Sequence, residues 1–295
     1  MKHIITTFSF FFLFLIMIIF PSQTLLGATN GLLLWFQIII PTLLPTLIIS
    51  NVLIISNAIP YITVYIGPIF QKLFSLSSNG SFAALTGFLC GYPVGAKVTA
   101  DLVKNKQISL KEGNYLLSFC NNTSPNFISS YIISQQFRET SLLIPSLCIL
   151  YVANYICSLL FRKYYRITKT HNKPDRKNLC FHFEIFDQAI MNAFETITKI
   201  GGYLIFFSIL FQWIKHPFLE ITTGIPLLIS NTKSFIHSYV SVMCLTSFGG
   251  LCSIAQTSSV LHGSGLSIFL YTLEKLITAL VTSLFAFLYV TIILR

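Results

Sequence analysis

Charged side chains are what this sequence of 295 residues has least of. Only 9% of its residues are Asp, Glu, Lys or Arg, and 54% are hydrophobic. Soluble globular domains have roughly a quarter of their residues charged. The shortage excludes an ordinary soluble domain. Together with the long apolar runs, it predicts an all-α polytopic membrane protein.

Sequence motifs for catalysis and metal binding are also missing. The seven cysteines form no C-x-x-C pair, and most lie in apolar runs, as small buried hydrophobes do. The six histidines are scattered, without the H-E-x-x-H spacing of a zinc site. There is no P-loop and no nucleophile paired with a base. We therefore expect no enzyme activity, no cofactor and no metal, and any transport is secondary or passive.

Basic residues exceed acidic ones, giving a formal net charge of +10. Nucleic-acid binding is one interpretation of this excess, but the bases gather in loops between apolar runs, as the positive-inside rule requires. The richest loop covers residues 162–177, which we expect to be cytoplasmic and to attract anionic lipids. No nucleic-acid partner is expected.

Counting apolar runs outward from that loop places both termini in the cytoplasm. The first run, residues 4–20, is either a transmembrane helix or a signal peptide, and its length favours the helix. The chain then divides into four parts: an N-terminal helix at 1–27, a first repeat at 28–161, a basic loop at 162–188 and a second repeat at 189–295.

Two glycine-bearing strings interrupt the apolar runs and resemble each other. One reads GFLCGYPVGA from Gly87, and the other reads GGLCSIAQ from Gly249, with their Leu-Cys pairs 162 residues apart. Backbone in a bilayer must be hydrogen-bonded internally unless protein buries it or it lines a cavity. Such a pair in corresponding halves points to a transporter binding site. We predict an inverted repeat with re-entrant hairpins at 82–96 and 240–262, beside about six transmembrane helices.

Gly87, Gly91 and Gly95 in the first string are spaced four residues apart. The spacing is typical of a small-residue ridge for close helix packing. Pro93 favours a hairpin tip instead, because proline breaks a helix interior. Such a tip exposes backbone N–H groups, and a helix that begins after it suits an anion.

Polar residues interrupt a third apolar run at 121–126, which reads NNTSPN. The segment is either a short extramembrane loop or a broken helix, and the short flanking runs favour the broken helix. A second polar cluster follows Gly250, from Ser253 to Ser259. The residues predicted to contact a substrate are Gly91, Tyr92, Pro93, Gly95, Asn121, Asn122, Thr123, Ser124, Gly249, Gly250, Ser253 and Gln256.

Several charged residues lie in or next to the apolar runs. Lys97 and Asp101 share a helical face, which is either an ordinary solvated face or a basic vestibule that draws anions to the first hairpin. Glu195 and Lys199 are spaced as an i, i+4 pair, and Glu274 is followed by a lysine that can neutralise it. Charges inside a membrane span are functional candidates by default.

Four strings together carry a resemblance to a known family. They are the GYPVGAK string at 91–97, NNTSP at 121–125, FGGL at 248–251 with Gln256, and Trp35 followed by Pro41 and Pro45. The chain resembles the YlbJ family of sporulation integral membrane proteins, whose membrane region belongs to the nucleoside-recognition, or Gate, class. It departs from that family in having Ser124 where glycine is usual.

The resemblance implies a fold similar to concentrative nucleoside transporters, with two re-entrant hairpins. It also implies export of dipicolinic acid, a small aromatic dianion, from mother cell to forespore across the outer forespore membrane. The alternatives are a nucleoside or other small-solute transporter of the bacterial cell membrane, and a non-transporting protein of spore-envelope assembly. The coupling ion, H⁺ or Na⁺, and formation of a homo-oligomer stay open.

Overall fold

The computed structural model describes residues 2–168, 179, 181–232 and 234–293, which form helices and connections without a strand. The expected all-α polytopic membrane protein is confirmed. Four described helices are long and apolar enough to cross a membrane, or five if one sharply bent pair counts as a span. About six were predicted, and the number is smaller because polar residues, glycines and prolines divide several apolar runs into short helices.

The N-terminal part is one long helical path with a sharp bend. Helix α1 (Lys2–Ile19) meets α2 (Pro21–Leu34) at an angle of 101°. Proline starts a helix readily but cannot continue one, which explains the bend. A π-helical turn, η1 (Trp35–Ile39), then joins α2 to α3 (Ile40–Ile55). The wider turn lies just before the two prolines of α3, where regular helical hydrogen bonds are lost.

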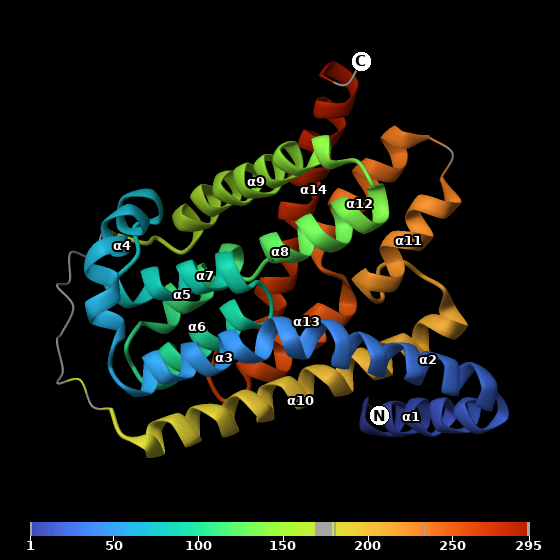
Figure 1. The fold of residues 1–295 in the computed structure, drawn as a ribbon, viewed down its shortest axis with the longest axis horizontal. Coiled ribbons are helices and arrows are strands. Elements are labelled where there is room, and N and C mark those ends of the chain that lie inside the picture. Colours follow the sequence, from blue (N-terminus) through green and yellow to red (C-terminus); the bar gives the residue numbers. More distant parts are fainter. Residues whose placement is uncertain (1, 169–178, 180, 233, 294–295) are drawn as a thin grey trace.

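Helix α10 (Phe183–Ile214) lies along α2 and α3 and runs in the opposite direction (Figure 1). The two paths touch closely, because a Cβ added at Gly31 would lie 2.6 Å from the Cα of Ile205. The indole N–H of Trp35 donates to the carbonyl oxygen of Ile197 at 2.9 Å. This antiparallel pair forms one side of the molecule.

The other helices make up the rest of the molecule (Figure 1). They are α4 (Ile59–Phe74), α5 (Ser78–Cys90), α6 (Val94–Lys104), α7 (Leu110–Cys120), α8 (Pro125–Phe127), the π-helix η2 (Ile128–Phe137), the 3₁₀ turn η3 (Thr140–Leu142), α9 (Leu143–Tyr164), α11 (Ile221–Asn231), α12 (Phe235–Phe248), α13 (Gly250–Leu261) and α14 (Ile268–Ile292). Among them, α5, α6 and α13 contact the antiparallel pair.

Element order is alike in the two halves of the chain. A long helix, a short helix and two helices on either side of a glycine break follow one another from Pro21 and again from Phe183. In the first half, this series is followed by a broken helix made of α7, α8 and η2. In the second half, it is followed by the continuous helix α14. The division into four parts at the predicted boundaries stays a prediction.

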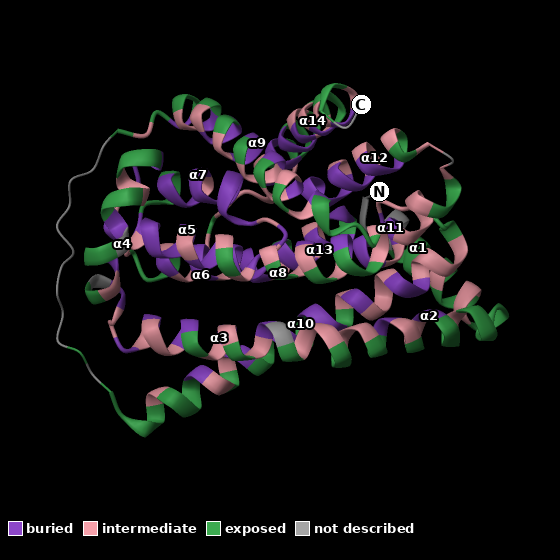
Figure 2. Ribbon diagram, turned by 45° about the horizontal axis from the view of Figure 1, so that its top comes forward, coloured by how far each residue is buried: buried purple, intermediate pink, exposed green. Residues whose placement is uncertain are grey.

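Burial separates an inner from an outer face. Buried residues concentrate on α5, α7, α12 and α13, whereas α1 and the outer faces of α2 and α10 are largely exposed (Figure 2). Many exposed side chains are large and apolar, such as Phe12, Leu25 and Met191. Lipid tails suit such a surface, and the polar contacts lie inside.

The second glycine string does not form the predicted hairpin. Helices α5 and α6 fold back on each other around the non-helical residues 91–93, so the first hairpin is present. Helices α12 and α13 instead continue as one 27-residue span, Phe235–Leu261. The difference has a local cause. Gly249 and Gly250 both have a positive φ, but the N–H of Gly249 still donates to the carbonyl of Leu245, and the helix resumes at Gly250 in a similar direction.

Candidate functional site

Residues 121–124 form a buried break between α7 and α8. Asn121 is fully buried and Thr123 is 7% exposed, so the segment is a broken helix and not an extramembrane loop. The Ser124 hydroxyl accepts the N–H of Phe127 at 3.2 Å and caps the next helix. The predicted break is therefore present, with its side chains inside the protein.

The turn of the first hairpin lies against this break. The N–H of Tyr92 donates to the carbonyl of Asn122 at 2.7 Å, and the N–H of Ala96 donates to Oδ1 of Asn121 at 3.3 Å. Gly91 has φ +81°, and a Cβ added there would lie 2.7 Å from the backbone nitrogen of Ser124. These tip N–H groups bond to the protein, contrary to the expectation that they are exposed to a ligand.

The glycines of the hairpin also serve as a packing ridge. A Cβ added at Gly87 or Gly95 would lie 2.0 Å or 2.5 Å from the carbonyl oxygen of Cys120. Only glycine allows α5 and α6 to approach the end of α7 so closely. The ridge and the hairpin, which the sequence offered as alternatives, are both present.

The break of the first half meets the glycine break of the second. The Thr123 hydroxyl donates to the carbonyl of Thr246 on α12 at 2.7 Å. The Asn121 amide donates to the hydroxyls of Thr257 at 3.0 Å and Tyr271 at 2.9 Å. A Cβ on Gly249 would lie 3.5 Å from the Tyr92 ring. Strings 162 residues apart in the sequence thus come together.

The start of α13 is held by the loop that precedes α11. Leu251 and Cys252 donate their N–H groups to the carbonyls of Phe218 at 2.8 Å and Leu219 at 2.9 Å. The Ser253 hydroxyl donates to the carbonyl of Gly250 within its own helix at 2.9 Å. The second break is thus supported by backbone contacts.

A cavity of about 160 Å³ lies beside the two breaks. Four predicted residues line it, namely Tyr92, Thr123, Ser124 and Gln256. The other eight predicted residues do not line it. Asn121, Gly91 and Gly95 instead hold the breaks together through the contacts above. Further polar residues of the lining, outside the predicted set, are Asn126, Ser130, Tyr131, Gln135, Glu220 and Thr222.

Glu220 is the acidic residue of this central cavity, and the sequence prediction missed it. It is 2% exposed, and its carboxylate accepts the N–H groups of Thr222 at 3.0 Å and Thr223 at 2.9 Å. The carboxylate thereby caps α11 at the positive end of the helix dipole. The sequence signal was an acid directly before two threonines and an apolar run, which is a common helix start.

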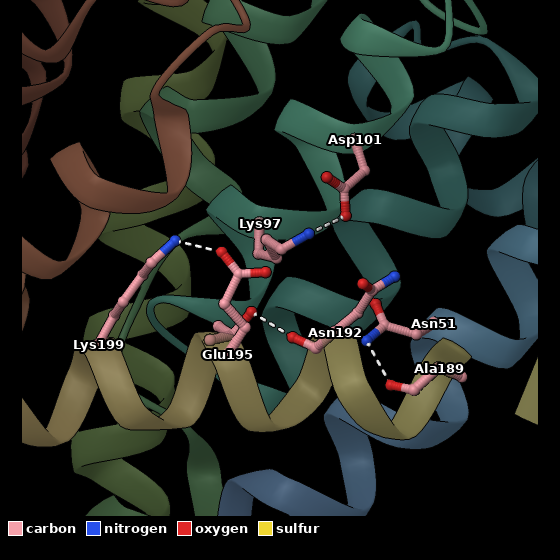
Figure 3. Close-up of polar contacts among 8 residues, drawn as sticks. Asn51, Lys97, Asp101, Ala189, Asn192, Glu195 and Lys199 are labelled. Carbon is pink, nitrogen blue, oxygen red and sulfur yellow. Dashed lines mark hydrogen bonds and ion pairs between the residues drawn. The ribbon is translucent and has the colours of Figure 1, made fainter. Parts of the chain in front are cut away.

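A second cavity of about 330 Å³ lies between α6, α10 and the end of α13, and we call it the basic vestibule. Figure 3 shows its two ion pairs, Lys97 with Asp101 on α6 and Lys199 with Glu195 on α10, each 2.5 Å long. Both pairings match the sequence prediction. The residues that line the vestibule are Lys97, Lys104, Asn192, Glu195, Thr196, Lys199, Ser259, Val260 and His262.

The two cavities follow each other along one face of α10. Residues 192, 195, 196 and 199 line the vestibule, and Ile200 and Leu204 line the central cavity. Residues three and four apart share a helical face, so the two linings form one continuous stripe. Helix α13 has the same order, with Ser259 at the vestibule and Gln256 at the central cavity.

Glu274 and Lys275 do not neutralise each other. Glu274 accepts the Tyr165 hydroxyl at 2.6 Å, whereas Lys275 donates to Oδ1 of Asn122 at 2.9 Å. The sequence analysis marked Glu274 as an intramembrane charge and gave Lys275 only the part of neutralising it. Its ammonium group turns out to support the break at 121–124.

Together the fold and the site define a polytopic all-α membrane protein in which two helix breaks meet beside a cavity lined by both polar and apolar side chains. Residues 36–142 match the family described as Gate, nucleoside recognition. The chain is also 26% identical to the sporulation integral membrane protein YlbJ of Bacillus subtilis (strain 168), over 94% of this chain and 81% of that protein. The resemblance predicted from the sequence strings is confirmed. No solved structure matches the chain.

Proposed function

We propose that this chain is a secondary transporter or facilitator, and not an enzyme, that moves a small anionic solute across a membrane of the sporulating cell. The solute is of the dipicolinate type, and its path leads from mother cell to forespore. Similarity to YlbJ supports the link to sporulation. Paired helix breaks beside a partly polar cavity support transport, because transporters bind solutes at such breaks.

The observation that carries the proposal is the succession of a basic vestibule and a central cavity along α10. Three lysines and His262 line the vestibule, and the carboxylates of Glu195 and Asp101 each pair with one of these lysines, which leaves the charge of Lys104 in excess. An excess of one charge sign in a cavity with protein walls raises the local concentration of counter-ions. An anion is therefore concentrated next to a cavity that offers hydroxyl and amide groups.

Glu220 limits how an anion occupies the central cavity. Two like unit charges 4 Å apart repel by about 4 kcal/mol at an effective dielectric constant of 20. Capping of α11 offsets part of this repulsion, because the carboxylate already accepts backbone N–H groups. The solute therefore enters with a cation or a proton, and its carboxylates lie toward Thr123 and Ser124 instead of Glu220.

Glu220 also favours a second candidate, a nucleoside transporter. A buried carboxylate accepts hydrogen bonds from the hydroxyl or amino groups of a neutral solute without repulsion. The family that matches residues 36–142 is described by nucleoside recognition. Analogy of fold is weak support for a substrate. We therefore prefer the anion transporter, because the basic vestibule favours an anionic solute.

Flux into proteoliposomes tests both candidates. We expect saturable uptake of labelled dipicolinate that excess uridine does not inhibit. Replacing Gln256 by Leu should lower the uptake at least tenfold, because it removes a polar group from the cavity lining. The matched control is Gln23→Leu, on the exposed face of α2.

Saturable uridine uptake without dipicolinate uptake would favour the nucleoside transporter. Absence of both fluxes, with correctly folded protein in the vesicles, would contradict transport and favour an assembly role.

A further inference from the structure

Lys275 on α14 is a buried ammonium group held by the broken helix. It is 1% exposed, and its Nζ donates to Oδ1 of Asn122 at 2.9 Å and to the backbone carbonyl of Asn121 at 3.3 Å. Both acceptors belong to the break at 121–124. The lysine therefore joins α14 to the point where α7 ends.

No carboxylate is paired with this ammonium among the described residues. The two ion pairs found there are Lys97 with Asp101 and Lys199 with Glu195, both in the vestibule. The neighbouring Glu274 bonds to Tyr165 instead. A buried charge without a counter-charge is costly, so such a residue inside a membrane protein is a functional candidate.

The surroundings of Lys275 are polar and almost free of charge. The thiols of Cys120 on α7 and Cys157 on α9 lie close enough to interact with it electrostatically. Tyr271 on its own helix shares the Asn121 amide, and Glu274 on α14 turns to α9. Helices α12 and α13 contribute the hydroxyl groups of Ser247 and Thr257 to this region.

The position of the ammonium is that of a coupling cation. Transporters with discontinuous helices hold Na⁺ or H⁺ at unwound carbonyls and at the C-terminal ends of half-helices. Asn121 directly follows the last residue of α7, where the helix dipole is negative. Lys275 thus places a covalently attached cation where a free metal ion would otherwise neutralise the carbonyls.

The break connects this ammonium to the central cavity. Asn121 and Asn122 hold Lys275, whereas the next two residues, Thr123 and Ser124, line the cavity. A change in the charge of Lys275 alters its hydrogen bonds to Asn121 and Asn122. It thereby shifts Thr123 and Ser124, which follow them in the chain. Solute binding and proton binding are thereby linked through four consecutive residues.

A small cavity beside the break has room for a water molecule that accepts the proton. Its volume is about 20 Å³, enough for one water molecule, and Asn122, Asn154 and Thr278 are in its lining. Oδ1 of Asn154 is buried and has no partner in the described structure, which suits an acceptor for such a water.

We propose that Lys275 is the coupling-ion site of this protein and that its ligand is a proton, not Na⁺. In the forward step an N–H bond of the ammonium breaks, the electron pair stays on Nζ, and the proton passes to water. The reverse step restores the ammonium. The proposal deepens the proposed transport function and rests on it.

Flux into proteoliposomes under imposed gradients tests this site. A pH gradient should change the initial rate of dipicolinate uptake at least fivefold, and an Na⁺ gradient should leave it unchanged. The arginine of Lys275→Arg keeps the positive charge but does not release its proton, and the methionine of Lys275→Met has no charge and no proton to release. Both variants should therefore lose the response to pH. Residual exchange of dipicolinate between the two sides in Lys275→Arg, even at a lower rate, would show that this variant is folded and has lost the coupling to protons. The matched control is Lys72→Met, an exposed lysine at the end of α4.

A second measurement does not need flux. Binding of dipicolinate to the purified protein in a weakly buffered solution should change the pH, by up to one proton per protein molecule. Lys275→Arg should bind dipicolinate without that proton change. An unchanged proton signal in this variant would overturn the proposal, and so would a wild-type response to Na⁺ instead of pH. Absence of both binding and flux in the wild type would overturn the transport function itself.

Discussion

The two glycine breaks look alike in the sequence but differ in the structure. At the first, three non-helical residues reverse the chain, and α5 and α6 pack side by side. At the second, Gly249 interrupts a helix that then continues as one span. A shared Leu-Cys pair and glycine are not enough to specify a hairpin. What separates the two strings is the proline after Gly91.

The surroundings of the breaks differ as well. Backbone atoms of α7 and of residues 121–124 press against Gly87, Gly91 and Gly95 at distances that exclude a side chain. Beside Gly250 the nearest atom to an added Cβ is the carbonyl oxygen of Phe218, 3.2 Å away. Beside Gly249 the nearest atom is Oγ of Ser253, 2.5 Å away, at the end of a side chain, so backbone packing is tighter at the first break than at the second.

Among variants of the two breaks, the largest loss of stability is expected at Gly91. Almost only glycine adopts the backbone conformation found here, and the strain of placing another residue in it costs about 1–3 kcal/mol. In addition, the added Cβ would collide with the backbone of Ser124. Gly91→Ala should lower stability by about 3 kcal/mol or more. Gly250→Ala, at φ +80° and with its nearest contact 3.2 Å away, should cost about 1–2 kcal/mol. Thermal unfolding of both variants in detergent measures the difference, and equal losses would contradict tighter backbone packing at the first break.

A smaller contrast is expected between polar residues of the two breaks. Asn121 bonds to Ala96, Thr257 and Tyr271, which lie on three different helices. Asn121→Ala leaves these buried groups without their partner, at about 1–3 kcal/mol for each unsatisfied group. Ser253→Ala removes one bond within its own helix and should cost about 1 kcal/mol or less. The same thermal unfolding assay compares the two variants. A larger loss of stability for Ser253→Ala would contradict the conclusion that the first break is the more tightly held.

Much of this arrangement was predictable from residue patterns. Hydropathy gave the membrane class, and the polar string at 121–126 gave the broken helix because it divides an apolar run. The spacing of Glu195 and Lys199 gave their ion pair. Such features depend on local sequence or on helical periodicity.

Features that depend on distant contacts were not predictable. The second string was predicted as a hairpin because nothing in it shows that Phe218 and Leu219 hold the start of α13. Glu220 stands in a weakly apolar region and enters the cavity only through the packing of α11. Lys275 is adjacent to an acid in the sequence, and only the rotation of α14 shows that the two point to different partners. The predicted lipid contacts of 162–177 fall largely outside the described residues.

The central claim is that a solute binds in the cavity where the two breaks meet. Cys90 lines that cavity, and Cys148 is an exposed cysteine on α9 that lies outside it. In variants that keep only one of these thiols, the rate of modification by a small thiol reagent can be followed with and without dipicolinate. Bound solute should slow the modification of Cys90 several-fold and leave Cys148 unchanged. Equal rates at Cys90 with and without saturating dipicolinate or uridine would contradict the account.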